Sequence, residues 1–249
     1  MAYLGEDSQV LCTGRVDFCN TGQIPRMGRD DFCSAGQIPR TGRDDFCNTG
    51  QIPRMGRDEI ASRAEELLNE CWDGCLPIDV EAICDYLGIA IVPVRGLKKE
   101  FEAEAYTAVG FKTIYVDWSS YESGNARYRF SVAHELGHFA LHREYFPSRV
   151  EDFDEWRGMA SNLGYVEFQA NYFAGSLLAP EVDLIFALNS EFGGSFARNC
   201  WETSREEFRS VLNRVQKFFG VSRQVLARRM RDLMPGVEKF EEVAMGLRR

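Results

Sequence analysis

The chain has 249 residues, of which 45% are hydrophobic, and a formal net charge of −9. This length and composition suit one or two globular domains with a buried core, and the acidic balance argues against nucleic-acid binding by the protein as a whole. The longest apolar run, residues 87–94, is too short to cross a bilayer, and Glu6 and Asp7 interrupt any start resembling a signal peptide. We therefore expect a soluble, cytoplasmic protein.

The eight cysteines show no disulfide framework. Cys19, Cys33 and Cys47 are copies within a tandem repeat, and the others are scattered without CxxC spacing. A cytosolic chain of this length needs no covalent cross-links, so we expect reduced thiols.

The N-terminal segment contains a fourteen-residue sequence in tandem, with copies that begin at Asp17, Asp31 and Asp45. Each copy has two glycines, one proline and balanced charge, without a helical or strand period. A unit this short, without a buried stripe, does not build a solenoid. We predict disorder or loose turns over residues 1–57. The functional alternatives are a linear interaction element and a redox-active array of thiols.

After the repeats, hydrophobic periodicity and capping residues predict the elements. Asp79 is a plausible N-cap, and Gly88 ends the helix that Asp79 begins. The predicted elements in chain order are helices 60–71 and 80–87, strand 89–94, hairpin strands 103–109 and 112–118 around Gly110, and helices 126–142, 166–178, 182–188, 204–219 and 222–233. Since no βαβ alternation is present, the predicted class is α+β.

The sequence His-Glu-Leu-Gly-His at residues 134–138 carries the strongest chemical signal. The chain's only three histidines, which include His142, fall within nine consecutive residues. Histidines four apart lie on one face of a helix, so His134 and His138 can bind one metal ion while Glu135 reaches a water beside it. The alternative is an ordinary amphipathic helix with histidines on its surface or in its core.

Gly137 stands inside this predicted helix, where glycine costs about 1 kcal/mol relative to alanine. Its presence predicts that another element packs closely there. The helix over residues 166–178 carries Ala170, Ala174 and Gly175, which permit such an approach. We hypothesise that this helix supplies a third metal ligand.

A catalytic zinc ion usually has three protein ligands and one open position. His142 lies one further helical turn, about 5.4 Å, beyond His138, so a straight helix cannot bring all three imidazoles to one ion. Glu167 is our candidate for the third ligand. From spacing alone, a solvated acid favoured by the helix dipole explains Glu167 equally well.

These two segments resemble the ImmA/IrrE family of metallo-endopeptidases. The family pattern R-F-x-x-A-H-E-L-G-H is matched at residues 129–138, and E-x-x-A-N-x-F-A-x-x-L-L-x-P is matched at residues 167–180. The resemblance also includes residues 77–80, 87–89 and 219–222, so it covers nearly everything after the repeats. The chain departs from the family in the loop between the two patterns, in Ala179 where methionine is common, and in the repeats themselves.

The resemblance implies a zincin-like metallopeptidase domain over residues 58–199, followed by a helical, helix-turn-helix-like subdomain over residues 200–249. It implies that His134, His138 and Glu167 bind the metal and that Glu135 is the catalytic base. Zinc suits this ligand set, and manganese also accepts it. The implied substrate is a helix-turn-helix repressor of the XRE type, cleaved in stress response or mobile-element control, with no membrane partner and no direct binding to DNA.

We expect Glu135 to take a proton from the attacking water and to deliver it to the leaving amine. A second electrophile is common in such sites. His142, Tyr165 and Tyr172 are candidates between which the sequence does not decide.

Two further residues or segments are expected to support the reaction. Asn171 lies four residues after Glu167 and could orient that carboxylate. Residues 112–117 are interpreted as an edge strand that pairs with an extended substrate.

The main alternative function is a DNA-binding regulator. Residues 218–230 have the pattern of a helix-turn-helix with a basic second helix, whose Arg223, Arg228, Arg229 and Arg231 could contact phosphates. A small packed helical subdomain with exposed arginines explains the same residues. A second alternative is a protein that sequesters a repressor without cutting it.

Overall fold

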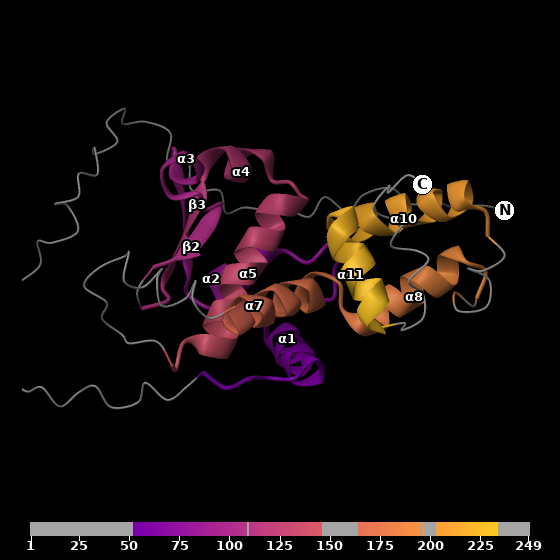
Figure 1. Cartoon of the computed structure of the whole chain (residues 1–249), viewed down its shortest axis with the longest axis horizontal. Coiled ribbons are helices and arrows are strands. Elements are labelled where there is room, and N and C mark those ends of the chain that lie inside the picture. Colours follow the sequence, from indigo (N-terminus) through magenta and orange to yellow (C-terminus); the bar gives the residue numbers. More distant parts are fainter. Residues whose placement is uncertain (1–51, 109, 146–163, 195, 197–202, 234–249) are drawn as a thin grey trace, which may run out of the picture. The chain divides into compact units, whose positions relative to one another are not determined.

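The computed structural model describes residues 52–108, 110–145, 164–194, 196 and 203–233. Helices and short strands come first, and the elements after α5 are all helices (Figure 1). The helices are α1 (Arg57–Cys71), α2 (Val80–Tyr86), α3 (Leu97–Phe101), α4 (Trp118–Ser123), α5 (Ala126–His142), α7 (Gly164–Leu178), α8 (Glu181–Glu191), α10 (Arg205–Phe219) and α11 (Arg223–Leu233); the strands are β1 (Ala90–Val94), β2 (Ala105–Thr107) and β3 (Thr113–Asp117).

The predicted α+β class is confirmed, with a small mixed sheet of order β1-β3-β2. The predicted hairpin is also confirmed, because β2 and β3 pair antiparallel around Gly110, whose φ of 85° suits glycine.

Our interpretation of residues 112–117 as an edge strand is wrong. Strand β1 runs parallel beside β3, with Ala90 opposite Thr113, so β3 is paired on both sides. Among the described residues, the open edges of this sheet are therefore those of β1 and β2.

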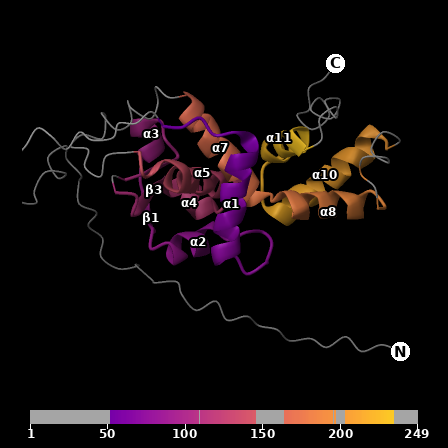
Figure 2. The same ribbon diagram turned by 90° about the horizontal axis from the view of Figure 1, so that it is seen from below.

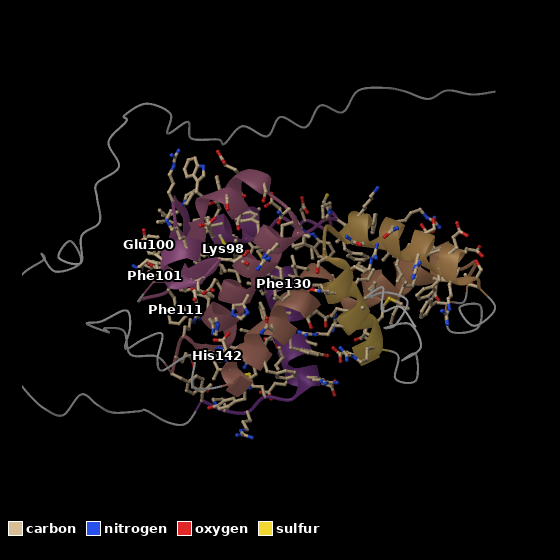
Figure 3. The ribbon with its side chains drawn as sticks, turned by 45° about the horizontal axis from the view of Figure 1, so that its top comes forward. Lys98, Glu100, Phe101, Phe111, Phe130 and His142 are labelled. Atoms are coloured by element: carbon tan, nitrogen blue, oxygen red, sulfur yellow. The ribbon has the colours of Figure 1, made fainter. Side chains whose placement is uncertain are left out.

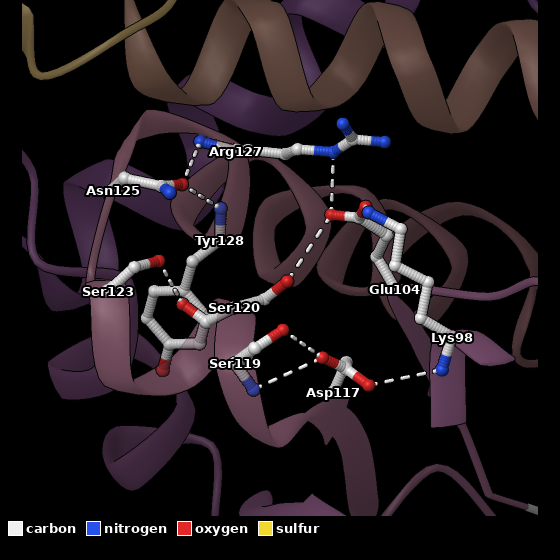
Figure 4. Close-up of polar contacts among 9 residues, drawn as sticks. All are labelled: Lys98, Glu104, Asp117, Ser119, Ser120, Ser123, Asn125, Arg127 and Tyr128. Atoms are coloured by element: carbon white, nitrogen blue, oxygen red, sulfur yellow. Dashed lines mark hydrogen bonds and ion pairs between the residues drawn. The ribbon is translucent and has the colours of Figure 1, made fainter. Parts of the chain in front are cut away.

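The short helices α3 and α4 were not predicted, because helices this short show no clear period. Side-chain contacts hold them beside the sheet (Figure 4). The carboxylate of Asp117 accepts hydrogen bonds from the main-chain N–H groups of Ser119 and Lys98, each at 3.1 Å. Glu104 forms ion pairs with Lys98 and with Arg127 of α5, both at 2.6 Å. The start of α5 is thereby fastened to the sheet.

The closest packing joins α5 and α7, which lie side by side in Figure 1. A Cβ atom added at Gly137 would lie 3.0 Å from both the Cα atom and the carbonyl oxygen of Ala170. The predicted close approach at this glycine is therefore confirmed. Only a residue without a side chain lets the two helix backbones come this near.

One hydrophobic core joins the N-terminal helices, which Figure 2 shows from below, to α5 and α7. Its fully buried side chains include Ile60, Ile83, Val132, Leu136, Phe173 and Leu177. The apolar faces of α8, α10 and α11 belong to the same cluster, including Leu184, Phe208, Val211 and Leu226. The division between domains near residue 200 stays a prediction.

The ordered contacts begin before the helix that we predicted as the start of the folded part. Ile52 is 8% exposed and packs with Phe111 and Val166. Residues 52–56 form neither helix nor strand and Arg57 begins α1, and the contacts of Ile52 join this part of the predicted segment to residues far away in the sequence. The rest of the predicted disordered segment, residues 1–51, lies outside the described residues.

Two smaller findings concern the cysteines and the membrane. Within the described ranges, Cys71, Cys75 and Cys84 are free. None of the helices in those ranges has the length and hydropathy needed to span a bilayer.

Arg129 joins α5 to two other segments. Its Nη2 donates to the carbonyl oxygen of Ile78 at 2.6 Å, and its Nε donates to that of Gly220 at 3.1 Å. We expect Arg129→Met to lower the free energy of unfolding by about 3 kcal/mol, since each carbonyl left without its donor costs about 1–3 kcal/mol. Urea denaturation measures this loss. The exposed control Arg209→Met should stay within about 0.5 kcal/mol of the unmodified protein, and equal losses in the two variants would contradict this role.

Candidate metal centre

Helix α5 presents His134 and His138 one turn apart, and the first turn of α7 presents Glu167 to them. The Nε2 atoms of the two histidines are 3.1 Å apart. The carboxylate oxygens of Glu167 lie 3.3 Å from Nε2 of His134 and 3.6 Å from Nε2 of His138. The structure thus brings together the three residues that we predicted as ligands.

The spacing of these donor atoms can be compared with that of a zinc site. Tetrahedral zinc with bonds of about 2.0–2.1 Å to nitrogen and oxygen places its ligand atoms roughly 3.3 Å from one another. The three observed separations, 3.1, 3.3 and 3.6 Å, lie around this value. The residues present therefore fit a zinc ion. A solvated acid at the start of a helix would not explain why the carboxylate of Glu167 turns to both imidazoles.

Glu135 is held beside this group by the edge strand β2. Its carboxylate accepts a hydrogen bond from Oγ1 of Thr107 at 2.7 Å and another from the main chain of Thr107. Burial raises the pKa of Glu135, and the charge of His134 and the bonds from Thr107 offset part of that rise. A carboxyl group with a raised pKa is a stronger base once it is ionised.

The electrostatic environment differs between the two predicted histidine ligands. Burial, followed by the charges of His134 and His142, holds the pKa of His138 well below its usual value, so this ring stays neutral. Burial also lowers the pKa of His134, but contacts with Glu167 and Glu135 outweigh it and the pKa is raised. Two carboxylates thus lie close to His134. A cation would balance their charge.

Buried polar contacts join His138 to three further residues, of which His142, labelled in Figure 3, is the first. Nδ1 of His138 lies 3.1 Å from Nδ1 of His142, and Nε2 of His142 lies 3.0 Å from Oε1 of Gln169. The amide nitrogen of Gln169 donates to the carbonyl oxygen of Pro53 at 3.0 Å.

The chemistry of these groups determines where each proton lies. Because the carbonyl of Pro53 can only accept, Gln169 must point its own oxygen at His142, whose Nε2 then carries the hydrogen. Nδ1 of His142 consequently accepts from Nδ1–H of His138. The remaining lone pair of His138 is on Nε2, which faces His134 and Glu167. The contacts beyond His138 therefore select the tautomer that a metal ligand needs.

Each of the three candidates for a second electrophile has other partners in the structure, so the choice between them stays open. Both ring nitrogens of His142 are engaged in the chain of contacts, and the hydroxyl of Tyr165 donates to the carbonyl of Ile52 at 3.0 Å. Tyr172 is 8% exposed and packs against the guanidinium group of Arg229. Each of these residues has at least one partner on another segment, namely Gln169 for His142, Ile52 for Tyr165 and Arg229 for Tyr172.

Asn171 supports the centre differently from our expectation. Its Nδ2 donates to the main-chain carbonyl of Glu167 at 2.7 Å, and its side chain also hydrogen-bonds His134. It therefore stiffens the first turn of α7 and holds one imidazole.

A cavity of about 390 Å³ borders Asn171 and extends between α5, α7 and α11, with Phe130 and Arg228 in its wall.

Two residues of the site were missed by the sequence analysis, Thr107 and Gln169. Gln169 could have been found from the sequence, since it lies in the buried stripe formed by Val166, Ala170 and Phe173. A polar side chain in such a stripe needs a specific partner. Thr107 could not have been found, because threonine is common in strands whatever its role.

Replacing the amide of Gln169 tests the chain of contacts. We expect Gln169→Leu to weaken zinc binding by about 10–100-fold, because His142 loses its acceptor and His138 is no longer held in one tautomer. Competition with a chromophoric chelator measures the affinity. Gln224→Leu, at an exposed position of α11, should leave it unchanged. Equal affinities in both variants would show that Gln169 does not orient the ligands.

Comparisons with protein families and solved structures show what this chain is similar to. Residues 84–231, more than half of the chain, match the sequence model of a peptidase family described as the IrrE N-terminal-like domain. Among solved structures, a Mycobacterium tuberculosis transcriptional regulator is similar with 19% identity and a TM-score of 0.46 over 71% of this chain. The match covers 57% of that regulator, so this chain spans little more than half of its length. No curated protein matches the sequence.

Proposed function

Because the chain belongs to the peptidase family described as the IrrE N-terminal-like domain, we propose that it is a zinc-dependent endopeptidase that cleaves a helix-turn-helix repressor of the XRE type. The observation that carries the proposal is the group of His134, His138 and Glu167, whose donor atoms all lie within 4.8 Å of one another. The buried Glu135 stands next to it. Two imidazoles and one carboxylate form a zinc ligand set used in hydrolases, and manganese also accepts these donors.

In this mechanism, His134, His138 and Glu167 would hold the ion, which when bound supplies Lewis acidity for a water molecule and for the substrate carbonyl. Glu135 removes the proton from the attacking water and transfers it to the leaving amine. Thr107 holds the carboxylate of Glu135 in place for both transfers.

The substrate strand is expected to pair with β2 rather than with β3. The N–H of Ala108 and the carbonyl of Glu104 bond to β3, so the main-chain groups of the alternate residues Ala105 and Thr107 face away from that strand. The N–H of Thr107 already donates to Glu135, which leaves the main-chain groups of Ala105 and the carbonyl of Thr107 for a substrate. An extended peptide along this edge would pass beside Glu135. Main-chain pairing of this kind holds a peptide without reading its side chains.

The DNA-binding alternative is weakened by the packing of α11. Arg229 is 3% exposed, donates to the carbonyl of Ala179 at 3.2 Å and lies over the ring of Tyr172. Arg223 donates to Asn213 of α10 at 2.9 Å. One of the four arginines that this alternative places at phosphates is therefore inside the protein, which favours the packed helical subdomain.

Incubation with an XRE-type repressor tests the proposal. We expect the repressor to be cut into two fragments, a chelator to abolish cleavage and added zinc to restore it. A stable complex without fragments would instead establish sequestration. Salt-dependent retardation of duplex DNA by the full chain, again without fragments, would establish the regulator.

A further inference from the structure

The three repeat copies share the tetrapeptide Gln-Ile-Pro-Arg, at residues 23–26, 37–40 and 51–54. The first copy is identical to the third over all fourteen residues, and the second differs from them at three positions. The described part of the chain begins inside the third copy, at Ile52. Its contacts therefore show how one copy of this sequence binds to the protein.

Each residue of Ile52-Pro53-Arg54 has a specific partner. The side chain of Ile52 is buried with Phe111 and Val166, and its carbonyl accepts a hydrogen bond from Tyr165 at 3.0 Å. The carbonyl of Pro53 accepts from Gln169 at 3.0 Å. The guanidinium of Arg54 lies 5.0 Å from the ring centre of Tyr165, a cation–π contact. We call Phe111, Tyr165, Val166 and Gln169 the repeat-binding surface; Figure 3 labels Phe111.

These contacts recognise only features that all copies share. They use one isoleucine side chain, two main-chain carbonyls and one arginine. We propose that the repeat-binding surface is a recognition site for Ile-Pro-Arg, and that the upstream copies within residues 17–44 occupy it whenever residues 52–54 leave it. The inference goes beyond peptide hydrolysis and does not depend on it.

Chain connectivity sets the order of preference among the copies. With α1 in place, binding of the second or first copy loops out 14 or 28 residues. Loop closure disfavours these states by roughly 50-fold and 150-fold, so the third copy holds the surface in the unmodified chain. A tethered segment has an effective concentration on the order of millimolar. At micromolar protein, the chain's own copies therefore outcompete those of a second molecule.

Replacement of residues 52–54 by an upstream copy would affect the metal centre, because the carbonyl of Pro53 is the last acceptor in the hydrogen bonds that begin at His138. Pro25 and Pro39 carry the same carbonyl in the same tetrapeptide. Each upstream copy can thus satisfy Gln169. A defect in one copy would leave the histidine tautomers unchanged.

Photo-crosslinking in the full chain tests the proposal directly. Phe139 packs against the cluster of Ile52, and p-benzoylphenylalanine in its place would capture whichever copy is bound. Trypsin releases the copies as residues 16–26, 30–40 and 44–54, three peptides of different mass. In the unmodified background we expect cross-links mainly to residues 44–54.

The variants Ile52→Asp and the milder Ile52→Ala remove the apolar anchor of the third copy. We expect the cross-link to residues 44–54 to fall more than tenfold, and those to residues 16–26 and 30–40 to rise above the level of a probe placed at the exposed Tyr121. Adding Ile24→Asp and Ile38→Asp should remove the new cross-links.

Two results would overturn the proposal. In one, the upstream peptides stay at the level of the Tyr121 probe in both Ile52 variants, while circular dichroism shows an intact fold. In the other, a mixture of ¹⁵N-labelled and unlabelled protein gives cross-links between the two labels. That result would assign the surface to a second copy of the chain.

Discussion

Replacement of Glu135 by glutamine is expected to lower cleavage of the repressor about 1,000-fold while the bound zinc remains. Glutamine has nearly the shape of glutamate and can still accept the hydrogen bond from Thr107, but it cannot take a proton from water. The side chain is not one of the three predicted ligands, so the ion should be held as before. Initial rates of repressor cleavage and metal analysis by atomic spectroscopy provide the two measurements.

The matched control is Glu181→Gln, the same change at an exposed position of α8. It should alter neither the rate nor the metal content. Full activity of Glu135→Gln would end the mechanism proposed here. Loss of the ion together with activity would show that Glu135 helps to bind the metal, and the roles of the four residues would have to be reassigned.

The second large effect is expected from Gly137→Ala, which should lower the free energy of unfolding by about 2 kcal/mol. Alanine favours a helix by about 1 kcal/mol over glycine, so the change would stabilise an isolated α5. Here the new methyl group would lie 3.0 Å from main-chain atoms of Ala170 and 3.3 Å from Cβ of Phe173. A helix backbone cannot yield as a side chain can. We therefore expect the overpacking to outweigh the gain in helix propensity.

The same substitution should weaken zinc binding about tenfold, because Glu167 lies one turn before Ala170 on the helix that must move. Urea unfolding and zinc titration measure the two effects. Gly175→Ala is the control in α7, since its methyl group would meet only the side chain of Arg229, at 3.3 Å. An unchanged zinc affinity in Gly137→Ala would show that the ligand geometry tolerates a shift of α7.

The local features of the site could be predicted because short-range geometry determines them. A spacing of four residues puts His134 and His138 on one face of any helix, whatever surrounds it. The cost of glycine in a helix pointed to a close neighbour at Gly137, and the structure places Ala170 there. The caps at Asp79 and Gly88 follow from side-chain and backbone chemistry in the same way.

Short-range geometry did not decide whether Glu167 is a metal ligand. Spacing left a ligand and a solvated helix-start acid equally supported, and only the family resemblance separated them. The structure turns its carboxylate to both imidazoles. The metal-binding role of the three residues stays a prediction that zinc titration can test.

The tertiary structure alone decided which residues orient the site. Thr107 reaches Glu135 because β2 lies at the sheet edge next to α5, and β3 is central because β1 pairs with its other side. Strand neighbours are chosen by contacts between distant segments, which a period of two residues does not encode. The segment at Pro53 likewise gains its role only by meeting Gln169, more than a hundred residues away. The sequence by itself thus determined the metal-binding face of α5, and the packing of distant segments determined what holds that face in its working form.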